Sequence, residues 1–185
     1  NARFSAGGLA GSVSNSTVSN VFSSVNILTG RNQGGLIGIL KDSTLSNSLA
    51  TGYVAQGYGL LRYSSSNDNS NLYWASDTSG QTTSTGSNAS YFGALLSELQ
   101  CPTTLDDDSC TDKGTLYENW DSEVWDFGSD RQLPGLIMNG VAYRDSDGDG
   151  ALDEDDAFPY NFSASIDLDS DGAADRWTTG CNAAC

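Results

Sequence analysis

The N-terminal half of the chain repeats itself, and this repeat limits the possible folds more than any other feature of the sequence. Two pairs of segments match at an offset of 27: GGLAG with GGLIG, from Gly7 to Gly34, and STVSN with STLSN, from Ser16 to Ser43. A third and weaker copy, with GLL at Gly59, follows the second at an offset of 24. A fixed period in the twenties is typical of a solenoid, in which each copy forms one layer.

Each copy of the repeat reads as a set of short strands. Brief apolar stretches alternate with Gly, Asn and Ser, and no helical period is present. One copy cannot bury its apolar side alone, so we expect the copies to stack about 4.8 Å apart with their apolar side chains in columns. The predicted columns are Leu9, Leu36 and Leu60, and Val18 and Leu45. Asn20, Asn47 and Asn71 either form an amide ladder between layers or only turn the chain, and the sequence leaves both interpretations open.

The GGLxG and STxSN elements resemble the GLUG motif, which recurs in large bacterial secreted and surface proteins. The resemblance covers about residues 5–75 and implies an all-β fold, a short right-handed parallel β-solenoid that we assign to residues 1–75. Members of the family are mostly adhesin-like, and the family carries no catalytic residues that could be assigned here. Because the chain starts inside a repeat, we expect that upstream repeats have been removed.

Residues 76–140 predict a linker, one short helix and Trp-rich strands. The stretch 76–92 is polar and has little potential to form a core. In the following residues Leu95, Leu96 and Leu99 recur at helical spacing, and Pro102 ends this helix.

The Trp-rich part has two interpretations. The stretch from Trp125 to Leu136 contains WDFG and LPGL and resembles the segment that often closes a block of GLUG repeats. This resemblance implies that large rings, Trp125 and Phe127 among them, cap the open end of the solenoid core. The alternative is a sugar-binding platform formed by Trp120, Trp125 or Tyr117.

The strongest chemical motif is an alternation of carboxylates over residues 145–156 (DSDGDGALDEDD), which we call loop 1. Ca²⁺ binds six to eight hard oxygen ligands. The spacing supplies acids at positions 1, 3, 5, 9 and 12 of a calcium loop and places Gly150 at its sharp turn. The predicted ligands are Asp145, Asp147, Asp149, the main-chain carbonyl of Ala151, Asp153 directly or through water, and Asp156.

A second such loop, residues 167–175 (loop 2), begins 22 residues after the first, at Asp167. Its predicted ligands are Asp167, Asp169, Asp171, the carbonyl of Ala173, and Asp175. Position 12 is Thr178, so we expect weaker binding unless Asp155 or another carboxylate completes the site. No amphipathic helix flanks either loop. The pattern therefore resembles thrombospondin type 3 repeats, and this resemblance implies a calcium-filled segment without helices over residues 141–185.

Charge divides the chain into two halves. Residues 1–100 contain four acids and four bases, whereas residues 101–185 contain 20 acids and four bases, which accounts for the net charge of −16. This excess of acid makes nucleic-acid phosphate a poor partner. The absence of histidine excludes Ser-His-Asp catalysis and His-ligated zinc. No apolar run approaches the ~20 residues of a membrane span.

Four cysteines predict disulfide bonds. Of the three possible pairings, the simplest joins neighbours in the sequence, Cys101 with Cys110 and Cys181 with Cys185. Their spacings do not fit a Cys₄ zinc site. Disulfides and calcium loops both indicate an oxidising, extracellular compartment, so we expect a secreted or cell-surface protein. The run Asp106–Asp108 reads as a surface loop.

These observations favour a non-catalytic, calcium-stabilised extracellular module, either a piece of a surface adhesin or the subunit of a self-assembling filament. The alternative is a secreted polysaccharide-binding protein or a polysaccharide lyase. A lyase needs a base beside a carboxylate cluster, and few acids accompany the bases of the repeat region, Arg3, Arg31, Lys41 and Arg62.

Because only six residues precede Gly7, nothing caps the first copy of the repeat, and we expect self-association through residues 1–40. A surface glycan or a host-cell ligand is the other expected partner.

Overall fold

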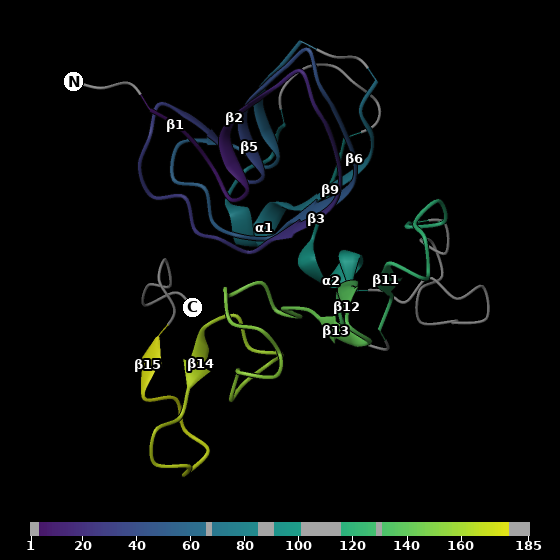
Figure 1. The fold of residues 1–185 in the computed structure, drawn as a ribbon. Helices are drawn as coiled ribbons and strands as arrows, with labels where there is room; N and C mark the ends of the chain where they lie inside the picture. Colours follow the sequence, from purple (N-terminus) through teal and green to yellow (C-terminus); the bar gives the residue numbers. More distant parts are fainter. Residues whose placement is uncertain (1–3, 66–67, 85–90, 101–115, 129–130, 178–185) are drawn as a thin grey trace.

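The computed structural model describes residues 4–65, 68–84, 91–100, 116–128 and 131–177 (Figure 1). These residues form a mostly β structure with two short helices, which confirms the prediction of an all-β fold. Within the described ranges three sheets are parallel and two are antiparallel.

The three parallel sheets each take one strand from every copy of the repeat. The first contains β1 (Ser5–Gly7), β4 (Asn32–Gly34) and β7 (Gly57–Tyr58), and the second contains β2 (Ala10–Ser14), β5 (Ile37–Lys41) and β8 (Leu61–Ser64). The third contains β3 (Thr17–Ser23), β6 (Thr44–Ala50), β9 (Ser70–Ala75) and β10 (Tyr91–Ala94).

Strand register follows the repeat. In the second sheet, Ala10 lies opposite Ile37, which is the offset of 27, and Ile37 lies opposite Leu61, which is the offset of 24. The same two offsets pair the strands of the third sheet from β3 to β9, for example Ser19 with Ser46 and Ser46 with Ser70. The sequence repeat and the hydrogen-bonded register are therefore the same alignment.

Apolar side chains from the second and third parallel sheets, and from the turns before β5 and β8, form one core cluster. Its buried members are Leu36, Ile37, Leu40, Leu45, Ala50, Leu60, Leu61, Leu72 and Trp74. The predicted column is correct for Leu36 and Leu60, but Leu9 is 48% exposed because no strand pairs with the outer edge of the first copy among the described residues. In the second column Leu45 is buried, and Val18 is partly buried against the same cluster.

Two glycines make room for the largest side chain of this core. A Cβ at Gly59 would lie 2.1 Å from Trp74 Cδ1, and one at Gly93 would lie 2.3 Å from Trp74 Cζ2. The indole N–H of Trp74 donates to the carbonyl of Gln81 at 2.9 Å. Any larger residue at either glycine would displace the indole from the core.

The three asparagines turn the chain, and the predicted amide ladder is present in one of its two steps, from Asn71 to Asn47. Asn20, Asn47 and Asn71 have φ values of 57°, 47° and 53°, so each bends its strand in the left-handed region that Asn tolerates better than most residues. The Asn71 amide also donates to Asn47 Oδ1 at 2.9 Å, as a ladder requires. Asn20 Oδ1 accepts from the indole of Trp125 at 3.1 Å, which ties the first copy to the Trp-rich segment.

The prediction for residues 76–100 was wrong in three details. The stretch 76–92 contains helix α1 (Ser76–Ser79) and the start of β10, which continues the third sheet beside β9. The predicted helix is shortened to α2 (Leu96–Leu99), and Leu95 precedes it and is exposed. Main-chain bonds to the open edge of β9 outweigh the weak helical pattern of so short a segment.

The Trp-rich segment covers the side of the third sheet instead of the end of the core. Its strands β11 (Trp125–Asp126), β12 (Gly135–Met138) and β13 (Val141–Tyr143) form an antiparallel sheet. Phe22, Leu49 and Tyr73 share one row across the third sheet, and the rings of this segment pack on that row. Tyr117, Trp120 and Trp125 are buried there, so the predicted sugar platform is wrong for these three rings.

Candidate metal sites

Loop 1 gathers three carboxylates at its start. Ligand oxygens of Asp145, Asp147 and Asp149 lie within 4.8 Å of one another, and these residues are 0%, 2% and 7% exposed. Three acids are seldom buried together without a cation, because each loses hydration and repels the others. This cluster could hold a metal ion.

Backbone hydrogen bonds set the orientation of these carboxylates. Asp145 accepts from the N–H of Gly148 at 2.7 Å and from that of Gly150 at 2.8 Å. Asp147 Oδ1 accepts from the N–H of Asp149 at 3.1 Å, and Asp149 Oδ1 accepts from the N–H of Ala151 at 2.8 Å. The remaining oxygens, Oδ2 of Asp147 and Oδ2 of Asp149, are buried and have no hydrogen-bond partner in the described part of the chain. Two buried acceptors without donors are what a bound cation would satisfy.

The electrostatics of loop 1 also favour a cation. Burial, followed by the charges of Asp149 and Asp145, raises the pKa of Asp147 to about 8. Burial raises the pKa of Asp145 to about 6, against the opposing effect of a hydrogen bond from Ser24. Burial also raises the pKa of Asp149 and of Asp156. The site therefore holds protons near neutral pH, and a divalent cation would replace them.

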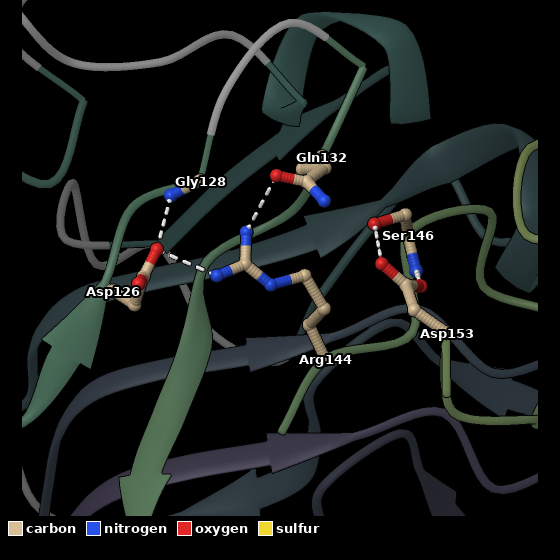
Figure 2. A network of polar contacts seen from close by, with 6 residues as sticks. All are labelled: Asp126, Gly128, Gln132, Arg144, Ser146 and Asp153. Carbon is tan, nitrogen blue, oxygen red and sulfur yellow. Dashed lines mark hydrogen bonds and ion pairs between the residues drawn. The ribbon is translucent and has the colours of Figure 1, made fainter. Parts of the chain in front are cut away.

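The two later acids of loop 1 that were predicted as ligands, Asp153 and Asp156, lie outside this cluster of three. Both carboxylate oxygens of Asp153 accept from Ser146, one from its N–H and one from its hydroxyl, each at 2.7 Å (Figure 2). Asp153 thus closes the loop on itself. Asp156 accepts from the N–H of Phe158 at 2.7 Å, and its charge adds to the rise in the pKa of Asp147. Asp156 is thus close enough to act on Asp147, and its ligand role stays a prediction.

Loop 2 has the same hydrogen bonds but a different environment. Asp167 accepts from the N–H groups of Ser170 and Gly172 at 2.7 and 3.0 Å, as Asp145 does from Gly148 and Gly150. The cluster within 4.8 Å is Asp167, Asp169 and Asp175. Asp171 Oδ1 instead accepts from the N–H of Ala173 at 2.8 Å. Asp169 and Asp175 are exposed to solvent, so loop 2 could hold a metal ion but is not buried against the fold.

Loop 1 is fixed to the parallel sheets by contacts that the sequence did not reveal. Ser24, just after β3, donates to Asp145. A Cβ on Gly148 would lie 3.1 Å from Thr51 Cβ, at the end of β6. The Gln100 amide donates to the carbonyl of Ser146 at 2.5 Å. None of these residues carries a motif, and only their position in the folded repeat brings them to the loop.

Arg144 joins loop 1 to the Trp-rich segment. Its guanidinium is buried, pairs with Asp126 at 2.5 Å and donates to Gln132 Oε1 at 3.0 Å (Figure 2). Asp126 also accepts from the N–H of Gly128 at 2.8 Å, and these bonds lower its pKa. Arg144 directly precedes the loop and is one of only four bases in the acidic half, which is the signal by which it could have been found.

Several predicted residues lie outside the described ranges. These are Cys101, Cys110, Cys181 and Cys185, together with Asp106–Asp108 and Thr178. The disulfide pairing and the missing acid of loop 2 therefore stay predictions.

Comparison with known proteins found no match to a protein-family model, to a curated protein or to a solved structure. Among the described residues, no helix has the length and apolar character needed to cross a membrane.

Proposed function

We propose that this chain is a calcium-stabilised, non-catalytic extracellular module with a structural or adhesive role. The observation that carries this proposal is a pair of buried carboxylate oxygens in loop 1, one on Asp147 and one on Asp149. Neither oxygen has a hydrogen-bond donor among the described residues, and both acids lie close to the fully buried Asp145. Burying carboxylate oxygens without hydrogen-bond donors costs free energy, and a bound cation would offset this cost.

Calcium is the ion that best suits the available ligands. Both clusters offer only carboxylates, and the chain contains no histidine. Hard oxygen ligands exclude ions that prefer sulfur or imidazole. Mg²⁺ demands near-ideal octahedral geometry and keeps several waters, whereas Ca²⁺ accepts six to eight oxygens in flexible arrangements, including main-chain carbonyls such as that of Ala151. Extracellular calcium would saturate even a weak site of this type.

Thermal unfolding tests this proposal. The full chain is unfolded in chelator, in excess CaCl₂ and in excess MgCl₂. Calcium is expected to stabilise the fold by about 2.7 kcal/mol at a concentration one hundred times the Kd, and magnesium by clearly less. A melt that is the same in all three buffers would refute the calcium assignment.

We further propose that residues 1–75 form a short right-handed parallel β-solenoid, as the GLUG resemblance implies. The support is the shared offset of sequence repeat and strand register, together with the order in which each copy supplies one strand to each parallel sheet. Such a unit would resist stretching and compression and suits a spacer or a filament subunit. A secreted or cell-surface location follows from the calcium and disulfide predictions.

Self-association through the N-terminal end is part of this proposal. The first copy leaves Leu9 exposed, while its equivalents in the later copies, Leu36 and Leu60, are buried. Phe4, just before β1, is exposed as well. A second copy of the chain would cover this apolar edge and its unpaired main-chain groups. Light scattering over a wide concentration range tests the idea. Leu9→Asp is expected to reduce association, whereas Met138→Asp, which changes an equally exposed residue on β12, should not.

The alternative function is a polysaccharide-binding protein or a polysaccharide lyase. The rings predicted to bind sugar, those of Tyr117, Trp120 and Trp125, are buried and cannot form that binding surface. A lyase assay on acidic polysaccharides distinguishes an enzyme from a binding module. We expect no product. Turnover of the polysaccharide would show that the protein is an enzyme and would contradict the proposed structural role.

A further inference from the structure

A pocket of about 370 Å³ lies where three parts of the molecule meet. One wall is the chain just after β3, with Ser24 and Asn26, and a second is loop 1, with Asp149 and Ala151. The third is the antiparallel hairpin of β14 (Ala164–Ile166) and β15 (Arg176–Trp177). Its volume is at the lower end of the range for small-molecule sites.

The hairpin contributes Arg176 and Trp177 to the lining of this pocket. Trp177 is 67% exposed, although the other three tryptophans of the chain are buried. Arg176 is the only base after Arg144, and it forms no ion pair with any acid among the described residues. An exposed indole and a guanidinium that has no ion-pair partner among the described residues thus both line this pocket, in the most acidic part of the sequence.

The wall formed by loop 1 would become less negatively charged when the proposed calcium ion binds. Asp149 and Ala151 are both predicted ligands, and both line the pocket. Without a cation those carboxylates of loop 1 that are ionised would repel an anion at this wall. One Ca²⁺ offsets two of the three negative charges that Asp145, Asp147 and Asp149 carry when they are ionised, and Arg176 is the base in the pocket lining that can pair with an anion. Asp156 also acts on Asp147, so its charge adds to the negative charge that the cation has to offset.

We propose that this pocket binds a pyranose sugar that carries a carboxylate, such as a uronate unit of an acidic polysaccharide, when loop 1 holds calcium. Arg176 pairs with the sugar carboxylate, for which the guanidinium fork is well suited. The ring stacks its C–H face on the indole of Trp177. Ser24 and Asn26 line the same pocket, and both side chains are held in place there: the Ser24 hydroxyl donates to Asp145, and Asn26 Oδ1 accepts from the N–H of Tyr53 at 2.8 Å. This inference rests on the proposed calcium site. It identifies acidic glycans as the class of ligand for the proposed adhesive role.

Fluorescence quenching by acrylamide tests the inference on the full chain. Because Trp177 is the exposed tryptophan, it accounts for most of the quenching. In CaCl₂ a galacturonate trisaccharide is expected to protect Trp177 from acrylamide in a saturable way. Its methyl ester, which lacks the negative charges, should bind at least about tenfold more weakly, and a glutamate tripeptide should give no protection. Equal binding of the ester or better binding of the peptide would overturn the assignment.

Two variants and one control locate the site. Arg176→Gln is expected to weaken trisaccharide binding about tenfold, because it removes a charge-assisted pair. The Trp177→Phe variant keeps a ring and should retain binding by calorimetry, whereas Trp177→Ala should lose it. Arg31→Gln, at an exposed arginine outside the pocket, should leave binding unchanged. If calcium stabilises the fold but the trisaccharide does not bind, this inference fails and the calcium module stands. If calcium has no effect on the melt, the proposed function itself fails.

Discussion

Loops 1 and 2 have closely similar internal geometry but very different surroundings. In each loop the first aspartate accepts from the N–H groups three and five residues later, and the third accepts from the N–H two residues later. Loop 1 is buried against the parallel sheets and the Trp-rich segment, whereas loop 2 lies in solvent. The comparison teaches that the short motif determines the shape of such a loop. The surrounding fold determines how strongly its acids need a cation.

Removal of the cation ligands should separate the loops most clearly. Asp147→Asn is expected to abolish most of the calcium stabilisation of the fold, about 2.7 kcal/mol at one hundred times the Kd, while Asp169→Asn retains most of it. Thermal unfolding in calcium and in chelator measures both. In chelator Asp147→Asn should be no less stable than the wild type, because the amide removes a buried ionisable group. A large loss in chelator would show that the substitution acts on folding and not on calcium.

The ion pair in front of loop 1 has no counterpart in loop 2, where the equivalent residue to Arg144 is Ile166. Asp126→Asn is expected to cost about 1–3 kcal/mol, toward the lower value because Asp126 is half-exposed. Calcium affinity should fall with it, because the start of loop 1 is no longer held to β11. Denaturant unfolding and calcium titration measure the two effects. Glu154→Gln, at an exposed acid of the same loop, is the control, and an equal effect of both would point to net charge alone.

Glycine substitutions test the packing of loop 1 directly. Gly148 and Gly172 have φ values of +78° and +83°, so alanine strains both backbones by about 1–2 kcal/mol. A Cβ at Gly148 also meets Thr51, whereas a Cβ at Gly172 meets nothing within 4 Å. We therefore expect Gly148→Ala to cost about 1 kcal/mol more than Gly172→Ala in global unfolding. Equal costs would mean that loop 1 does not pack on the sheet.

The pH dependence differs between the apo and calcium-loaded forms. The pKa of Asp147 is raised from 3.8 to about 8 and that of Asp145 from 3.8 to about 6. A raised pKa in the folded state stabilises the fold below pH 4, and this contribution is lost as pH rises through 6 and 8. Without calcium the melting temperature should therefore fall between pH 4 and 8. Calcium affinity should rise over the same range, because the ion displaces protons. An apo melting temperature that rises over this range would contradict the burial of these acids.

The sequence predicted what depends on local pattern and missed what depends on tertiary placement. The offsets of 27 and 24 predicted the strand register, and alternate aspartates predicted both acid clusters. Leu9 was expected inside because it matches Leu36, yet burial also requires a neighbouring layer on each side. Sequence matching cannot reveal where such a stack of strands ends.

The same distinction explains the acids and the rings. Asp153 fits a ligand position by spacing, but one of its oxygens accepts from the backbone N–H of Ser146 and the other from the Ser146 hydroxyl. The rings of Trp120 and Trp125 suited either an end cap or a sugar platform. Their actual place depends on the outward row of the third sheet, in which Phe22 and Tyr73 carry no motif of their own.

Calcium titration calorimetry of the wild type, Asp147→Asn and Asp169→Asn tests the central claim most directly. We predict a tighter and a weaker binding phase in the wild type, loss of the tighter phase in Asp147→Asn, and loss of only the weaker phase in Asp169→Asn. Retention of the tighter phase in Asp147→Asn, or its loss in Asp169→Asn, would contradict the claim that burial makes loop 1 the principal calcium site.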